Sequence, residues 1–529
     1  MPTDCISFQS SGYFSKLMQD YLDQKPELKP LYNNFPSLEN FEKQIAEKSA
    51  NFDHNNRTAL VATLQKQYQN IEASDLTKQN ISLLALENTF TITTGHQLNL
   101  FSGPLYFLYK IISTINLTKE LKSKYPSHNF VPVYWMATED HDFEEINYFN
   151  FKGKKIRWNA ESTGPVGRLS TEGLEDLFEV YSLELGSSTN ANALKKLFKD
   201  AYLKHENLAD ATRYLANALF ASYGLVIIDA DDADLKRAFI PFVKEELENQ
   251  TSFKEVQKSI EELSAYTVQV NPREINLFYI EDKLRERIIF ENDKYVVNNT
   301  KISFSKDEIF KLLESNPEKF SPNVIMRPLY QEIILPNLCY IGGGGEIAYW
   351  LELKAFFEAV NITFPILLVR NSVLLATEKQ VKKADNLNLT WKDLFSKSES
   401  LVNEITHKLS PFPIDLTPQR EALDKQFAYL FELAEKTDKS FSGAVKAQEV
   451  KQKKGLENLE KRLLKAQKRK LADQLERVTD LQCELFPNNS LQERQANFSE
   501  FYLEKGEQLI PLLIQKLKPL EHNFDIIII

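Results

Sequence analysis

The chain has 529 residues, of which 43% are hydrophobic and 26% charged, proportions that exclude a disordered or fibrous protein. Because single hydrophobic cores stop growing near ~250–300 residues, at least two structural units are expected. The formal net charge of −10 argues against wholesale binding of nucleic acid. The start of the chain lacks a basic segment followed by an apolar one, and no apolar run approaches the ~18–20 residues that span a bilayer. We therefore expect a cytoplasmic protein without a membrane partner.

Residues 1 to about 80 are predicted to be mainly helical and to lead into a first strand. A β-branched run at 89–93 predicts that strand, and Thr94-Gly95-His96-Gln97 follows it. Gly103-Pro104 then opens an apolar helical pattern that runs to Leu117. This is a strand, loop and helix.

A second apolar run, Phe130–Met136, predicts a neighbouring parallel strand. It ends in the acidic sequence Glu139-Asp140-His141-Asp142. Both polar clusters would therefore follow the carboxyl ends of adjacent parallel strands, where open α/β sheets bind ligands. Their position favours a functional site.

Two insertions and three further βα segments are predicted after Asn147. Residues 148–158 read as a hairpin, and residues 251–320 contain short strand-like runs. The predicted elements between and after them are the strand Gly224–Asp229, the helix Leu235–Leu247, strand-like runs at 267–270, 277–280 and 286–290, the helix Ile347–Val360 and the strand Phe364–Arg370. We expect a Rossmann-like, doubly wound α/β core over residues 1–380, with insertions near 148–200 and 250–320.

Residues 381–487 are predicted to form an antiparallel α-helical coiled-coil hairpin. Thr417-Pro418 is a typical helix start, with Thr417 as the cap. Apolar residues recur at heptad-like steps in two stretches: Leu423, Phe427, Leu430 and Ala434, then Leu456, Leu459, Leu463 and Ala466. Pro487 ends the second stretch. The tail, 488–529, ends in four isoleucines that we expect to return to the core sheet.

The first candidate constellation is the loop Thr94-Gly95-His96-Gln97. A helix start with free backbone amides can hold phosphate or carboxylate, and His96 could donate to developing negative charge. The alternative is a histidine that merely bridges a loop. Residue type alone does not decide between a functional and a structural histidine, and the position at the end of a strand favours a functional one.

The second constellation is Glu139-Asp140-His141-Asp142, with Glu144 and Glu145 close behind. Such a group could hold Mg²⁺ carried by a nucleotide, or act as the general base for an amine nucleophile. The alternative is a solvated acidic helix N-terminus. No protein-bound metal is predicted, because one histidine with carboxylates is a poor zinc set and the three cysteines lie far apart.

The glycine run Gly342–Gly345 precedes Glu346 and would let backbone amides approach an anion. It lacks the residues of a P-loop and the spacing of GxGxxG, so the alternative is a tight turn. Arg327 and Arg370 could each bind a carboxylate or phosphate, or form a structural ion pair.

Two other features have plain readings. The run 446–470 holds ten Lys or Arg against three Glu, and a solvated coiled-coil face is favoured over a nucleotide or acidic partner. Cys339 lies in an apolar stretch and is interpreted as a buried structural thiol.

Several of these motifs together resemble the bacillithiol-biosynthesis cysteine-adding enzymes. The resemblance rests on the segments at 94–97, 102–106, 139–143, 321–324, 342–350, 486–488 and 491–494. Their order holds across nearly the whole chain. The chain departs from the family pattern at His96, where many members carry glutamine, and at Gly344, where proline is frequent. The first departure weakens any claim that His96 is an obligatory catalyst.

The resemblance implies a Rossmann-like core with two insertions, a coiled coil that forms a homodimer, and ligation of L-cysteine to glucosaminyl-malate. Because a free carboxylate needs a leaving group to form an amide, we hypothesise that ATP activates the cysteine carboxylate as a phosphate or adenylate, with Mg²⁺ arriving on the nucleotide as an option. The expected catalytic residues are Asp140, His141, Asp142 and His96. The residues expected to bind substrate or nucleotide are Thr94, Gly95, Gln97, Ser102, Gly103, Tyr106, Asn147, Arg327, Gly342, Gly343, Gly344, Gly345, Glu346, Tyr349 and Arg370.

Two other function classes remain open on sequence alone. A nucleotidyl-transfer or RNA-associated enzyme of related Rossmann type would use the basic run to bind acidic chains. A non-catalytic dimeric scaffold would explain the coiled coil but leave both strand-end clusters idle.

Overall fold

The computed structural model describes Met1 and residues 4–529, which divide into two compact units. The core unit comprises Asp4–Leu374, Leu491–Ile527 and Ile529. The hairpin unit comprises Leu375–Ser490 with Met1 and Ile528. None of the described helices is both long and apolar enough to cross a lipid bilayer.

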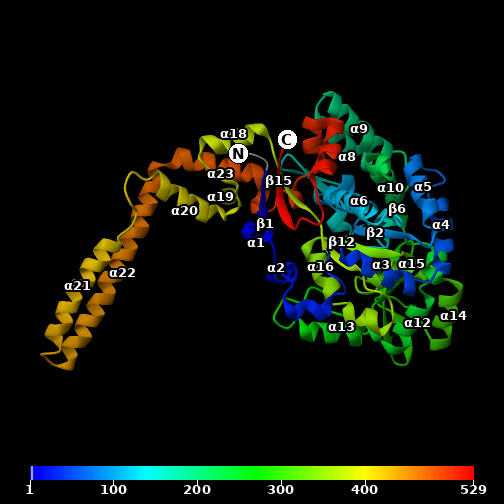
Figure 1. Ribbon diagram of the computed structural model, residues 1–529, viewed down its shortest axis with the longest axis horizontal. Coiled ribbons are helices and arrows are strands. Elements are labelled where there is room, and N and C mark those ends of the chain that lie inside the picture. The colour runs from blue at the N-terminus through cyan, green and yellow to red at the C-terminus, as the bar shows by residue number, and fades with distance from the viewer. Residues whose placement is uncertain (2–3) are drawn as a thin grey trace. The chain divides into compact units, whose positions relative to one another are not determined.

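A five-stranded parallel sheet forms the centre of the core unit (Figure 1). Its strands, in spatial order, are β13 (Ile366–Val369), β12 (Asn337–Gly342), β2 (Thr89–His96), β3 (Asn129–Met136) and β6 (Val226–Asp229). Every neighbouring pair is parallel, which confirms the predicted doubly wound α/β sheet. The chain first builds outward from β2 through β3 to β6 and then resumes on the other side with β12. The order therefore reverses between β2 and β12, and such a switch point is where ligands bind in open α/β sheets.

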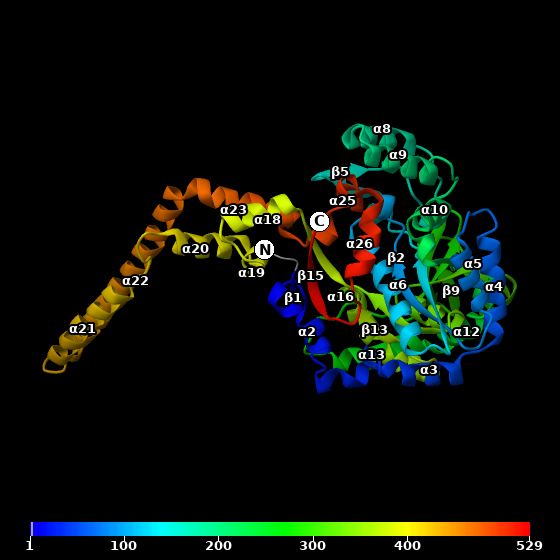
Figure 2. The same cartoon turned by 45° about the horizontal axis from the view of Figure 1, so that its top comes forward.

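The register aligns the polar ends of the strands. His96 pairs with Met136, and Met136 pairs with Asp229. The strands are buried on both faces because helices pack around the sheet (Figures 1 and 2), so most of their residues are apolar or threonine. One buried cluster joins α3 and α6 side chains to those of β2, β12 and β13.

The first part of the core unit is helical, as predicted. The helices are α1 (Phe8–Ser11), α2 (Lys16–Leu22), η1 (Pro26–Leu31), α3 (Asn40–Asn51), α4 (Asn55–Gln67), α5 (Asp75–Leu83), η2 (Leu100–Ser102) and α6 (Tyr106–Lys124). A short strand, β1 (Asp4–Ser7), precedes them.

Both insertions are present. The first contains α7 (Phe143–Ile146), the antiparallel hairpin β4 (Tyr148–Phe151) and β5 (Lys154–Arg157), η3 (Val166–Arg168), α8 (Leu174–Leu185), α9 (Thr189–Tyr202), α10 (Leu208–Phe220) and η4 (Ala221–Tyr223). The second follows α11 (Ala233–Arg237) and α12 (Ile240–Asn249) and contains α13 (Thr251–Glu262), β7 (Leu277–Glu281), β8 (Leu284–Glu291), β9 (Lys294–Val297), β10 (Ser303–Phe304), α14 (Lys306–Ser315), η5 (Pro317–Lys319) and β11 (Phe320–Pro322). Its five strands form an antiparallel sheet in the order β10-β9-β8-β7-β11.

The remaining elements come after the second insertion in the chain. They are α15 (Met326–Ile334), α16 (Gly344–Leu351), α17 (Lys354–Ala359), β14 (Ser372–Ala376), α24 (Gln492–Gln495), α25 (Phe498–Lys505), η7 (Gly506–Gln508), α26 (Leu509–Lys516) and β15 (Asn523–Ile528). The prediction that the isoleucine tail joins the core sheet is wrong. β15 pairs antiparallel with β1, Asp525 opposite Cys5, in a separate sheet of order β1-β15-β14. The N-terminal strand thus satisfies the backbone groups of the tail.

Three other predicted elements differ from the structure. Residues 267–270 form no strand, because the N–H groups of Gln269 and Val270 donate to the Glu352 carboxylate instead. The helix predicted over 235–247 is split into α11 and α12, since Pro241, near the start of α12, has no N–H to continue the first helix. The helix predicted over 347–360 is split after Leu351, where the Glu352 N–H donates to Tyr349 O and closes the last turn.

Most residues of the hairpin unit are helical. Its helices are α18 (Glu378–Asn386), α19 (Trp391–Phe395), α20 (Ser398–Leu409), α21 (Thr417–Ala434), α22 (Lys439–Lys470), α23 (Ala472–Leu485) and η6 (Pro487–Asn489). Helix α21 packs on α22 around Phe427, Ala434 and Val445, which confirms the hairpin. Two details were predicted wrongly. Thr417 is not the cap, because it already lies in the helix and its N–H donates to Asp415. Leu459 is 54% exposed and is not part of the cluster that joins α21 to α22.

Candidate active site

A cavity of about 1070 Å³ opens at the carboxyl ends of β2, β3 and β12. Its walls include Gly95–Gln97 after β2, the turn Ala137–Asp142 after β3, and Gly343, Gly345 and Glu346 after β12. Residues 269–299 of the second insertion supply a further wall. The cavity thus lies at the switch point of the sheet, and all of its lining belongs to the core unit.

A buried ion pair fixes the glycine run. Lys110 Nζ lies 2.5 Å from Glu346 Oε2 and donates to Gly95 O at 2.7 Å. Glu346 Oε2 also accepts from Gly343 N at 2.9 Å, and its other oxygen accepts from the Tyr340 hydroxyl at 2.7 Å. Burial opposes ionisation of Glu346, but Lys110 and these hydrogen bonds outweigh it and lower its pKa. The pair therefore links the loops that follow β2 and β12.

Two arginines, the buried Arg370 and the partly exposed Arg327, supply positive charge. Arg370 Nη2 donates to Glu493 Oε1 at 2.8 Å, and Nη1 donates to Asn371 O at 2.9 Å. Its Nε has no partner among the described residues, and a Cβ built on Gly343 would lie 3.8 Å from it. Arg327 donates to Gln331 at 3.0 Å through Nη1. Each arginine thus has one side held by the fold while the residue lines the cavity.

His96 lies between these charges. Its ring contacts Tyr106 and Phe107, with centroids 5.4 and 5.0 Å away. Burial, Lys110 and Arg370 lower the pKa of His96 well below its ordinary range, so the imidazole is neutral. Its Nε2 is buried and unpartnered among the described side chains. The ring already makes a hydrogen bond to the Ser102 backbone, which uses the single proton of the neutral imidazole, so the unpartnered Nε2 is an acceptor and brings no charge.

The acidic turn after β3 is held more loosely. Gln97 Nε2 donates to Asp140 Oδ2 and Glu145 Oε2, both at 2.9 Å. His141 Nδ1 lies 2.6 Å from Arg285 Nη1, and the Arg285 guanidinium stacks over Phe278. His141 and Asp142 are exposed, and Asp140 is partly so. These carboxylates can accept a proton from, or hold, a bound ligand.

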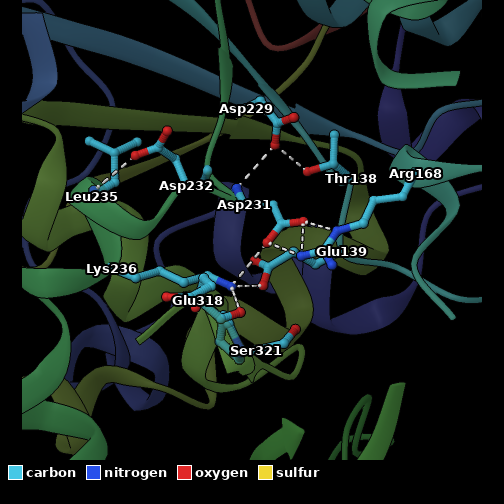
Figure 3. A network of polar contacts seen from close by, with 12 residues as sticks. Thr138, Glu139, Arg168, Asp229, Asp231, Asp232, Leu235, Lys236, Glu318 and Ser321 are labelled. Atoms are coloured by element: carbon cyan, nitrogen blue, oxygen red, sulfur yellow. Dashed lines mark hydrogen bonds and ion pairs between the residues drawn. The ribbon is translucent and has the colours of Figure 1, made fainter. Parts of the chain in front are cut away.

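A second charge network anchors the base of the same turn (Figure 3). Lys236, almost fully buried, lies 2.5 Å from Glu139 Oε1 and 3.3 Å from Asp231 Oδ1. Arg168 pairs with Asp231 at 2.8 Å from the other side. Thr138 donates to Asp229 at 2.5 Å, so the ends of β3 and β6 are joined. Glu139 is therefore a structural residue, whereas Asp140 and Asp142 remain directed to the cavity.

The turn also offers a potential cation site. One ligand atom from each of Asp140, His141 and Asp142 lies within 4.8 Å of the others. The two carboxylates fit Mg²⁺, which prefers oxygen ligands. His141 does not, because the Arg285 guanidinium already lies against its Nδ1.

Comparison with known proteins decides the family. Residues 1–371 match the family described as "Bacillithiol biosynthesis BshC, N-terminal Rossmann-like domain", and residues 373–529 match its "C-terminal coiled-coil domain". The chain belongs to the BshC family. A protein of Flavobacterium johnsoniae is 84% identical over 529 residues, which are 100% of both chains. One of Flavobacterium psychrophilum is 64% identical, covering 100% of this chain and 99% of its own, and one of Staphylococcus carnosus is 29% identical over 69% of this chain and 71% of its own. All three carry the name "Putative cysteine ligase BshC".

The BshC chain brings most of the predicted site residues together. Those that line the cavity are Gly95, His96, Gln97, Tyr106, Asp140, His141, Asp142, Arg327, Gly343, Gly345, Glu346, Tyr349 and Arg370. Gly344 lines a smaller neighbouring cavity of about 160 Å³. Five predicted residues, Thr94, Ser102, Gly103, Asn147 and Gly342, line neither of these cavities.

These outlying residues shape the backbone. Thr94 donates to Ile341 O at 2.7 Å and so ties β2 to β12. Gly103 has a φ of +60°, and a Cβ there would lie 2.6 Å from Asn99 Cβ, so only glycine fits. Ser102 and Asn147 are buried, and Gly342 is the last residue of β12. Their effect on a ligand is indirect.

Sequence reasoning missed Lys110, Arg285, Glu352 and the role of Glu493. Lys110 had a readable signal, since it is a lysine inside the otherwise apolar, buried face of α6. Glu493 lay in a segment of the family resemblance, but its contact with Arg370 spans 123 residues and has no local pattern. Arg285 and Glu352 likewise act on residues far from them in sequence.

Proposed function

We propose that this protein joins the carboxyl group of cysteine to the amine of glucosaminyl-malate, with ATP as the activating cosubstrate, to form bacillithiol. Family membership over the full chain and the ligase name of the relatives support a ligation. The observation that carries the proposal is the cavity at the switch point, where cationic side chains and accessible carboxylates face the same space. The reaction needs cationic side chains to bind the carboxylates of the substrates and carboxylate side chains to act on the amine.

The cationic wall suits the carboxylates of the substrates. Arg370 keeps an Nε without a partner among the described residues, and Lys110 and Arg327 line the same cavity. Paired guanidinium groups bind carboxylate and phosphate in a defined orientation. We assign the malyl carboxylates to Arg370 and Arg327, and the phosphates of the nucleotide to the backbone amides of Gly344 and Gly345, since the Gly343 N–H already donates to Glu346.

The acidic turn suits the amine. A free carboxylate does not form an amide in water, so ATP must first convert it to an acyl phosphate or an acyl adenylate. The sugar amine then attacks the acyl carbon, and phosphate or AMP leaves. Asp140 or Asp142 accepts the proton that the amine loses. Donors at the glycine run stabilise the oxyanion of the tetrahedral intermediate.

A nucleotide-borne Mg²⁺ is compatible with Asp140 and Asp142. It would neutralise phosphate charge during activation. His141 takes no part in holding it, because its Nδ1 lies against Arg285.

The hairpin unit supports a homodimer as part of this proposal. Tyr429, Val450 and Leu459 on α21 and α22 are each more than half exposed, so these helices carry large apolar side chains that a second copy could cover. Sedimentation equilibrium of the protein and of a Val450→Lys, Leu459→Lys variant tests this part. A monomeric wild-type protein contradicts it.

The direct test of the reaction is incubation of purified protein with cysteine, glucosaminyl-malate and ATP, followed by mass spectrometry of the amide product. We expect product only when ATP is present, and loss of product in Asp140→Asn. Asp234→Asn, a substitution of an exposed aspartate outside the cavity, is the matched control. Absence of amide from the wild-type protein under all nucleotide and metal conditions contradicts the proposal.

A further inference from the structure

One stretch of the cavity wall carries neutral amides instead of charges. Gln269, Asn271 and Asn298, all from the second insertion, line the cavity. Within the described part of the chain, their side-chain amides make no hydrogen bond with another residue. The contrast is Asn323, whose Oδ1 accepts from two backbone N–H groups at the start of α15 and whose Nδ2 donates to Asn276 at 2.8 Å. The first three are free to bind a ligand, and Asn323 is not.

Amides of this kind match hydroxyl groups. A side-chain amide both donates and accepts, as a hydroxyl does, and it needs no charge on the ligand. The cationic wall already accounts for the carboxylates of the proposed substrate. The rest of glucosaminyl-malate is the sugar ring with its hydroxyl groups. The neutral wall therefore complements the sugar, and the charged wall complements the carboxylates.

The segment that carries Gln269 and Asn271 is tied down by one side chain. Residues 267–272 are outside any helix or strand. Glu352 Oε1 accepts from Gln269 N at 2.6 Å, and Oε2 accepts from Val270 N at 3.2 Å. Across the described chain, these two are the backbone hydrogen bonds that residues 267–272 make. Glu352 itself is 1% exposed and lies outside the cavity.

Holding the segment through the Glu352 carboxylate has an energetic cost, because this carboxylate is buried. Burial raises the pKa of Glu352 to about 7, and the two backbone N–H groups offset this only in part. No lysine or arginine is paired with it among the described ion pairs, in contrast to Glu346 on the same helix. A buried carboxylate that holds an exposed loop destabilises the fold, so its presence indicates that the loop position matters to the site.

We propose that Gln269, Asn271 and Asn298 bind the hydroxyl groups of the sugar and that Glu352 is the positioning residue that holds this wall. The sugar's identity rests on the proposed function. The amides contact the substrate directly, and Glu352 acts through the backbone of Gln269 and Val270.

The first test uses the full-length Gln269→Ala, Asn271→Ala protein. Loss of two neutral hydrogen bonds raises the KM for glucosaminyl-malate about tenfold, with the KM for cysteine and kcat unchanged. Calorimetric titration of glucosaminyl-malate shows the same loss of affinity. Gln65→Ala, an exposed amide on α4 away from the cavity, is the matched control and leaves both values unchanged.

The second test uses Glu352→Gln, which keeps the volume but turns an N–H donor towards the loop. We expect a several-fold rise in the KM for glucosaminyl-malate together with an unchanged or higher melting temperature, because the buried charge is gone. A purely structural role predicts the opposite pairing, with a lower melting temperature and an unchanged KM.

Assays of the wild-type protein distinguish a failure of the sugar-binding proposal from a failure of the proposed function. If it binds glucosaminyl-malate and forms the amide while both variants keep wild-type KM and affinity, the sugar wall is wrong and the proposed function stands. An equal rise in the KM for cysteine also overturns the sugar wall. If the wild-type protein neither binds nor converts glucosaminyl-malate, both are wrong.

Discussion

The glycine-run wall and the acidic turn both place carboxylates at the cavity, but the fold treats them differently. Glu346 is paired with Lys110, accepts two further hydrogen bonds and has a lowered pKa. Among the described residues, neither Asp140 nor Asp142 forms an ion pair with a lysine or arginine, and Asp142 is exposed. One wall is an assembled electrostatic scaffold, and the other is available to a ligand.

The paired carboxylate of Glu346 shapes the site, whereas the carboxylates of Asp140 and Asp142 are available to react in it. A carboxylate whose oxygens are already occupied cannot also take a proton from a substrate, whereas a loosely held one can. Changes to the first wall should therefore reduce stability and activity together. Changes to the second should reduce activity alone.

The largest expected effect comes from Lys110→Met. The substitution leaves Glu346 largely buried without its cation, and breaking such a pair costs about 2–3 kcal/mol of unfolding free energy after allowance for partial exposure. Urea unfolding followed by tryptophan fluorescence measures the loss. Activity falls as well, because the Gly95 loop loses its tie.

The control for Lys110→Met is the double variant with Glu346→Gln. Removing both charges eliminates the uncompensated carboxylate, so more than half of the lost stability should return. If the double variant is as unstable as the single one, the pair is not the reason for the loss.

The next largest effect is expected from Asp140→Asn. An asparagine cannot accept the amine proton, and loss of a general base typically costs about 100-fold in kcat. The unfolding free energy should change by less than about 0.5 kcal/mol, since the side chain is partly exposed. Asp142→Asn, measured in the same assay, shows which of the two carboxylates is the base. A parallel loss of stability and activity in both variants would place the turn with the scaffold.

The contribution of Glu352 to folding stability depends on pH and so tests the comparison. Its pKa rises from 4.5 unfolded to about 7 folded, so the folded chain binds the proton more tightly. The stabilisation is fully present below pH 4.5 and is lost as pH rises through about 7. Between pH 5 and 8 the wild-type protein should lose about 2 kcal/mol relative to Glu352→Gln, less than the full linkage value because the exposed loop relaxes. Thermal unfolding of both proteins across this range measures the difference, and parallel curves would contradict it.

Local patterns were enough to predict the strands and one wall of the site. The run 89–93 and Phe130–Met136 are β-branched or apolar because helices cover both faces of the sheet, and polar residues begin where each strand ends. The acidic turn and the glycine run could therefore be placed at the same sheet edge. The same logic failed for the isoleucine tail, since pairing with β1 at the other end of the chain leaves no local trace.

The charge pairs of the site could not be read from the sequence. Arg370 meets Glu493, and Glu352 meets Gln269, across 123 and 83 residues. Which charge is paired depends on the fold. Arg327 and Arg370 looked alike in the sequence, but among the described residues Arg370 forms a buried ion pair with Glu493, whereas Arg327 forms no ion pair and donates to Gln331.

The smallest effect is expected from Gln97→Ala, which tests how loosely the acidic turn is held. Gln97 Nε2 bridges Asp140 and Glu145, and its loss leaves two like charges without their shared donor. One neutral donor to charged acceptors is worth about 1 kcal/mol here, or a roughly fivefold fall in kcat/KM, with stability unchanged. Gln97→Glu adds a third negative charge at the same place and should fall further. If Gln97→Ala instead reduces kcat as strongly as Asp140→Asn, the amide is part of the reacting constellation, and the acidic turn is as preorganised as the glycine-run wall.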